Sequence, residues 1–141
     1  MIAKRMSRIG VAGIALVLFA MSACTTVAHP LEATEWKLVE WTLSSIGPEP
    51  FAIRATFAGG KVSGFSGVNS YGGPFTASAG GAFSAGPFSR SKKGHTGDAM
   101  RAEDAYLTLL SQAKSYAATG NRMTLYDAGG NESLVFEALE R

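Results

Sequence analysis

Side chains that often carry catalysis are scattered along this 141-residue chain. Its two histidines, His29 and His95, lie far apart, and the sequence contains no Ser-His-Asp order, no zinc-ligand spacing and no phosphate-binding loop. Asp98, Glu103 and Asp104 place three carboxylates near the start of an expected helix, where negative charge suits the helix dipole without acid-base chemistry. We therefore expect no catalytic residue, no metal site and no enzymatic activity.

The single cysteine, Cys24, follows a segment with three parts. Basic residues open it, residues 9–21 are uncharged and mostly apolar, and small residues precede the cysteine, as in a secretory signal peptide. The apolar run of about 13 residues is shorter than the roughly 20 that a membrane-spanning helix needs. Met21-Ser22-Ala23-Cys24 resembles the lipobox of bacterial lipoproteins, with Met21 where leucine is usual. The resemblance implies acylation of Cys24, and ordinary cleavage after Ala28 is the alternative.

Acylation of Cys24 would divide the chain into a signal peptide at 1–23, a lipidated tether at 24–31 and one domain at 32–141. In the lipoprotein pattern, Thr25 rather than aspartate after the cysteine implies the periplasmic face of the outer membrane. We therefore expect an exported protein whose membrane partner is reached through the lipid. Three of the 13 basic residues precede Cys24, so the processed chain carries a slight acidic excess. With no clustered basic face, the sequence does not indicate a nucleic-acid partner.

Several segments have the period-two alternation of half-buried β-strands. Between residues 64 and 88, glycines are interleaved with aromatic residues, which predicts short, sharply curved strands with bulges and tight turns. Near the C-terminus, Asp127-Ala128-Gly129-Gly130-Asn131 separates two apolar runs, a hairpin signal. The segments expected to form strands outside the glycine-rich run are 35–41, 52–58, 61–65, 122–126 and 133–137.

Residues 96–115 instead have helical spacing, with apolar side chains recurring every three or four positions. This spacing places Arg101, Glu103 and Asp104 on the opposite, solvent-facing side. The whole pattern predicts a mainly β (α+β) fold, a small curved antiparallel barrel-like sheet of about seven to eight strands with one helix packed on it. The expected inward stripe of the helix consists of Ala99, Ala102, Tyr106, Leu109, Leu110 and Ala113.

The glycine-rich run also contains a recognisable motif. Its members are Ser63, Gly64, Gly67, Asn69, Tyr71 and either Gly72 or Gly73. They resemble the SGxxGCNxYxG stretch of the META domain, the family of HslJ-like heat-shock lipoproteins. The resemblance extends over residues 31–139, including the opening strand, Gly86-Pro87-Phe88 and the helix. It implies a small barrel-like fold with one helix, no established catalytic activity and no cofactor.

Two positions depart from the family pattern, in which many members have a pair of cysteines. Val68 stands at the first cysteine position, and an alignment without gaps puts His95 at the second. A register shifted by five residues would put Met100 there instead, but it breaks the match of the helix. The alignment without gaps therefore predicts that Val68 and His95 face one another.

Three residues are candidates for binding. Asn69 and Tyr71 lie in the most motif-like segment, although a left-handed turn at Asn69 and packing of Tyr71 would explain them structurally. Trp36 and Trp41 are five residues apart on one strand, which predicts that they face opposite sides of it. Trp36 matches the family core, so Trp41 is the better candidate for an exposed binding aromatic.

The sequence leads to two hypotheses for function. The first is a non-enzymatic cell-envelope lipoprotein that binds another envelope component, such as an envelope protein, with a stress-related role suggested by the family. The alternative is a carrier that holds a small apolar ligand inside the barrel. A barrel of eight strands can hold one small ligand or be filled by its own side chains, and the many phenylalanines favour a filled interior.

Overall fold

The computed structural model of the protein describes residues 30–42, 45–94 and 97–139. The expected signal peptide, the acylation site Cys24 and His95 lie outside the described residues. Every buried core side chain of the described part lies between Leu31 and Phe136, so this segment carries a complete core of its own.

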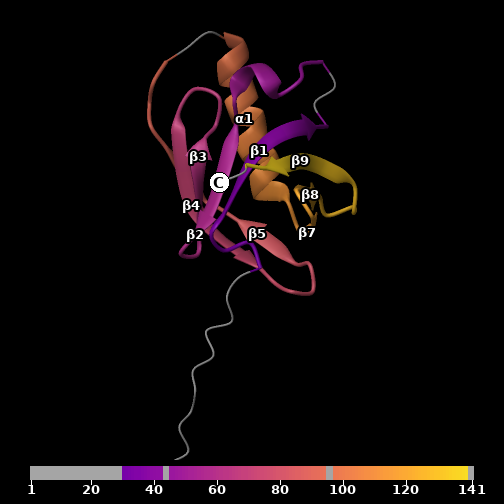
Figure 1. Ribbon diagram of the computed structural model, residues 1–141. Helices are drawn as coiled ribbons and strands as arrows, with labels where there is room; N and C mark the ends of the chain where they lie inside the picture. Colours follow the sequence, from indigo (N-terminus) through magenta and orange to yellow (C-terminus); the bar gives the residue numbers. More distant parts are fainter. Residues whose placement is uncertain (1–29, 43–44, 95–96, 140–141) are drawn as a thin grey trace, which may run out of the picture.

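In the described residues, nine antiparallel strands form one curved sheet around one α-helix, α1. Figure 1 shows α1 between β2–β4 on one side and β7–β9 on the other. Eight strands follow the order β5-β4-β3-β2-β1-β9-β8-β7, and β6 pairs with β4 outside this path. The elements are β1 (Thr34–Trp41), the 3-10 helix η1 (Glu49–Phe51), β2 (Arg54–Ala58), β3 (Lys61–Phe65), β4 (Ser70–Ala77), β5 (Phe83–Ala85), β6 (Ser89–Arg90), α1 (Gly97–Gln112), β7 (Ser115–Thr119), β8 (Arg122–Tyr126) and β9 (Glu132–Ala138).

The two edges of the sheet meet and nearly close it into a barrel. Phe83 N–H donates to the Lys114 carbonyl at 2.9 Å, and Tyr116 N–H donates to the Gly81 carbonyl at 2.9 Å. These bonds join β5 to β7, and they cover backbone groups that open sheet edges would leave unpaired. The prediction of a barrel-like antiparallel sheet of about seven to eight strands with one helix is confirmed.

Large side chains occupy the interior of the barrel. The ring of Phe57 lies edge-on to Phe75 and Phe83, with centroids 4.8 and 6.3 Å apart. On the helix side, Tyr106 lies edge-on to Phe136 at 6.4 Å. Rings at these separations add to the stability that their burial provides.

A bulge in β1 overturns the prediction that Trp36 and Trp41 face opposite sides. Leu38 pairs with Phe136 and Glu40 with Val135, so two steps along β1 match one step along β9. The side chains of directly opposed residues on two paired strands point to the same face of the sheet. The extra residue in β1 therefore shifts the in–out alternation of its side chains by one position. Trp41 therefore faces the same side as Trp36. It is half-buried, and its ring packs on Phe51 with centroids 6.4 Å apart.

The barrel has two distinct ends. β1 starts beside the β2–β3 turn, where Thr34 pairs with Phe57 and the Glu32 carboxylate accepts a hydrogen bond from Gly59 N–H. The start of α1, η1 and the 66–69 corner meet at the other end, since a Cβ on Gly67 would lie 3.5 Å from Phe51 Cβ. In Figure 1 the described chain begins at the bottom and α1 begins at the top.

Candidate functional site

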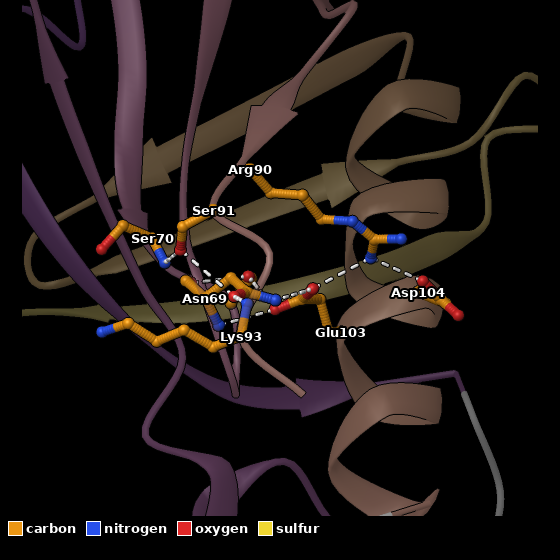
Figure 2. A network of polar contacts seen from close by, with 8 residues as sticks. Asn69, Ser70, Arg90, Ser91, Lys93, Glu103 and Asp104 are labelled. Atoms are coloured by element: carbon orange, nitrogen blue, oxygen red, sulfur yellow. Dashed lines mark hydrogen bonds and ion pairs between the residues drawn. The ribbon is translucent and has the colours of Figure 1, made fainter. Parts of the chain in front are cut away.

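The motif residues form a tight corner between β3 and β4. Ser66 N–H donates to the Asn69 carbonyl at 2.9 Å, which turns the chain back on itself. The corner packs against the first turns of α1, while β6 and the residues after it run along its other side (Figure 2). Three segments that are distant in sequence thus converge on one buried polar cluster.

Glu103, from α1, lies at the centre of this cluster, and its side chain has 0% exposure. Its Oε2 accepts hydrogen bonds from Ser66 Oγ at 2.6 Å and Asn69 N–H at 2.8 Å. Its Oε1 accepts from Asn69 Nδ2 at 2.8 Å and Arg90 Nη1 at 2.9 Å. The prediction that Glu103 faces solvent is therefore wrong. Position 103 follows Ala99 by four residues and precedes Tyr106 by three, so the helical spacing places it on the inward stripe.

Asn69 joins the carboxylate to the chain after β6. Its amide nitrogen donates to Glu103, and its Oδ1 accepts from Ser91 Oγ at 3.1 Å and from Lys93 N–H at 2.7 Å. The expected left-handed turn is absent, since Asn69 is not among the described non-glycine residues with positive φ. These hydrogen bonds, rather than backbone conformation, explain the asparagine. Only 2% of Asn69 is exposed, so it is not available to a partner of the folded domain.

Arg90 covers the cluster from the solvent side. Its Nη1 donates to Glu103 and, at 2.6 Å, to Asp104 Oδ1. The hydrogen bond to Asp104 and the two carboxylate charges outweigh desolvation and raise the pKa of Arg90. For Glu103 the largest effect is burial, which raises the pKa of the carboxyl, but hydrogen bonds from Ser66 and Asn69 and the charge of Arg90 together outweigh it. The pKa of Glu103 therefore lies below its usual value, and the carboxylate is ionised at neutral pH.

Tyr71 and Tyr106 form a second buried pair beside this cluster. Their hydroxyl oxygens are 2.6 Å apart, and Tyr71 also donates to the Arg54 carbonyl at 3.0 Å. Because a carbonyl only accepts, the proton of Tyr71 is used there, and Tyr106 donates to Tyr71. Burial raises the pKa of both phenols, so both stay neutral at physiological pH. Gly64 lets the backbone of Arg54 approach β3 closely, because a Cβ at position 64 would lie 2.2 Å from the Arg54 oxygen.

These contacts describe a structural junction rather than an open reaction centre. In the described part of the chain, no buried side-chain polar atom lacks a hydrogen-bond partner. The same residues contain no group of three or more His, Cys, Asp or Glu side chains placed to hold a metal ion. Glu103 has no exposed surface, so a substrate would have to displace Arg90 to reach it. The carboxylate instead ties the β3–β4 corner and β6 to α1.

Sequence reasoning singled out Asn69 and Tyr71 but missed the residues that give them a role. The spacing of Glu103 on the helix was a readable signal, because it falls on the same stripe as Tyr106. Ser66 and Arg90 carry no such signal, since their partner lies 37 and 13 residues away in the chain. Val68, which the sequence resemblance aligns with the first family cysteine, is a buried core residue with 8% exposure.

Trp41 takes no part in the cluster. Its indole N–H donates to the Ile46 carbonyl at 2.6 Å, which holds the residues around Ile46 against the end of β1. Two shallow hollows flank this contact, one of about 430 Å³ beside Glu40 and one of about 190 Å³ beside Arg101. Ile46 is 38% exposed and Trp41 is half-buried, so apolar side-chain surface is accessible beside this hydrogen bond.

Residues 29–140 match the family model of the META domain. The chain belongs to the META domain family. Among solved structures, a Burkholderia xenovorans protein determined by NMR is similar to this META domain chain, with a TM-score of 0.65 and 21% identity. That match covers 99% of this chain and 100% of the other. A crystal structure of a DUF4847 family protein from Bacteroides vulgatus has a TM-score of 0.58 and 13% identity, covering 79% of this chain and 96% of the other.

At such identities the two neighbours show a shared fold alone. No curated protein sequence matches the chain. Within residues 30–42, 45–94 and 97–139, no helix is both long and apolar enough to cross a membrane. The matched residues include the buried cluster of Ser66, Asn69, Arg90 and Glu103.

Proposed function

We propose that this META domain protein is a non-enzymatic lipoprotein of the cell envelope, held on the membrane by acylated Cys24. It binds another envelope component through the apolar surface formed by Trp41 and Ile46. A stress-related role is the extension that the family resemblance suggests. The observation that carries the proposal is the position of this surface, beside η1 and at the opposite end of β1 from the start of the described chain.

The geometry of the chain supports this orientation. Pro30 is the sixth residue after Cys24, a reach of at most roughly 20 Å, so an acylated Cys24 would keep the end of the barrel near Thr34 close to the membrane. The other end then points away from the membrane. Ile46 and Phe65, the exposed large hydrophobic side chains of the described part, both belong to that far end. An apolar surface at this end suits a protein partner that approaches from the side away from the membrane.

The anchor is tested by Cys24→Ser in the full precursor. Because acylation needs the thiol, we expect the variant to be lost from the membrane fraction or to accumulate unprocessed, whereas the wild-type chain stays with membranes after salt and carbonate washes. Immunoblots of fractionated cells give the readout. Equal retention of both proteins would contradict lipid anchoring.

The partner surface needs a separate test that leaves the anchor intact. A photo-crosslinking amino acid placed at Ile46 should give a discrete covalent adduct in intact cells. The same group at Ala79, an exposed residue of the β4–β5 turn, serves as the matched control and should give none. Adducts of the same size from both positions, or from neither, would contradict a binding surface at Trp41 and Ile46.

A further inference from the structure

An open groove lies on the outer face of β3 and β4, away from the buried cluster and from Trp41. Its volume is about 650 Å³, within the range of small-molecule sites. The strand register puts Lys61 beside Pro74 at one end, with Ser63, Gly72 and Ser89 in one row across three strands at the other. Pro87 and Phe88 form a wall of the groove.

Two adjacent glycines in β4 have different roles in this groove. A Cβ on Gly73 would lie 2.5 Å from the Pro87 oxygen and 2.7 Å from Phe88 Cδ1, so Gly73 is required for the wall to pack against the strand. A Cβ on Gly72 would meet nothing closer than the Val62 oxygen at 3.7 Å. Gly72 also lacks a positive φ, so neither its backbone conformation nor the approach of another chain segment accounts for it.

Glycine inside a strand weakens it and often marks a place where a ligand or another backbone comes close. A neighbouring backbone explains Gly73, whereas at Gly72 the surface of the strand is open to the approach of a ligand. The wall is rigid enough to shape a site, because the ring of Phe88 packs edge-on against the buried ring of Tyr71, with centroids 6.0 Å apart.

The charged side chain that lines the groove is a cation, Lys61. Lys61 is exposed, and it forms no ion pair with any residue of the described ranges. Glu32 lies near the same turn, where its carboxylate accepts a hydrogen bond from Gly59 N–H, and it does not line the groove. The rest of the lining is glycine, proline, aliphatic and aromatic carbon, and the hydroxyls of Ser63 and Ser89. An apolar groove with one free cation complements a molecule with an apolar body and one negative group.

We infer that this groove binds a small amphipathic carboxylate, with its apolar body over Gly72 and against the Pro87–Phe88 wall and its carboxylate at Lys61. The site lies outside the barrel, so it does not require space in the filled interior. The site is also separate from the lipid anchor and from the Trp41–Ile46 surface. The inference therefore does not depend on the proposals of lipid anchoring and partner binding.

Decanoate and decanol are the probes, since they share an apolar chain and differ in charge. The protein is the chain from Thr25 onward, which contains the complete core between Leu31 and Phe136. Titration followed by amide chemical shifts should show saturable decanoate binding, with shifts confined to residues 61–63, 72–74 and 86–89. Lys61→Gln should weaken decanoate binding about fivefold or more and leave decanol binding unchanged, as expected for loss of a charge-assisted contact. Lys92→Gln, an exposed lysine outside the groove, is the matched control and should change neither.

Gly72→Val fills the floor of the groove and should weaken both probes about tenfold or more. Its thermal unfolding midpoint should stay near that of the wild type, because the new Cβ meets no protein atom closer than 3.7 Å. If this variant does not fold, Ser63→Leu fills the neighbouring part of the groove from β3 and replaces it. The inference is overturned if decanoate shows no saturable shifts in the groove, if a folded blocking variant binds as the wild type does, or if Lys61→Gln leaves decanoate binding unchanged.

Discussion

Replacing Glu103 with glutamine is expected to lower the free energy of unfolding by roughly 3 kcal/mol, the upper end of the cost of orphaning a buried hydrogen-bonding group. The carboxylate accepts four hydrogen bonds, two of them from Asn69. A glutamine amide has one oxygen, and its NH₂ group would point at donors instead of accepting from them. Arg90 is 39% exposed and can be solvated, so the loss falls mainly on the buried donors Ser66 and Asn69.

The neighbouring Asp104→Asn is the matched control. Asp104 binds the same Arg90 nitrogen, but its side chain is 61% exposed. Exposed ion pairs contribute at most about 1 kcal/mol, so this change should have a small effect. Urea titrations of the two variants and the wild type at neutral pH give the comparison. Equal losses for both variants would mean that Glu103 is no more important than a surface carboxylate.

The second large effect is expected at Trp36, where substitution by alanine should cost roughly 3–5 kcal/mol. Trp36 is 4% exposed, and its indole N–H donates to Thr34 Oγ1 at 2.8 Å. Trp41→Ala should cost less, about 1–2 kcal/mol, because a half-buried ring has less apolar area to lose. Denaturant titrations of both variants measure the difference. A greater loss at Trp41 than at Trp36 would contradict the packing of β1.

The overall architecture was predictable from local patterns. Alternating residues in 35–41 and 122–126 marked strands, and the stripe of Ala99, Ala102 and Tyr106 marked the inward face of the helix. These signals are local because strands and helices repeat over a few residues. The sequence predicts a barrel-like fold but not that β5 and β7 close it. These two strands are about 30 residues apart in the chain, and a local sequence pattern does not show which distant segments pair.

The misplaced residues have specific physical causes. Trp41 was assigned to the wrong face because a bulge inserts one residue into β1, and no glycine or proline between Leu38 and Trp41 marks it. Glu103 was assigned to solvent because charged side chains are rarely buried without a partner. Its partners, Asn69 and Arg90, come from other segments, so its burial depends on tertiary contacts that a helical pattern does not contain.

The ionisation of Glu103 is the most direct test of the view that the motif residues build a structural junction. Because its folded-state pKa lies below that of the unfolded chain, the carboxylate stabilises the fold above about pH 4.3. That stabilisation is lost as the pH falls through the folded-state pKa. A ¹³C NMR titration of the Glu103 carboxyl should therefore give a pKa below about 4.3, with no change of charge between about pH 5 and 8. A pKa raised to about 6–7, the range of a general acid or base, would contradict the structural role and indicate a reactive carboxyl instead.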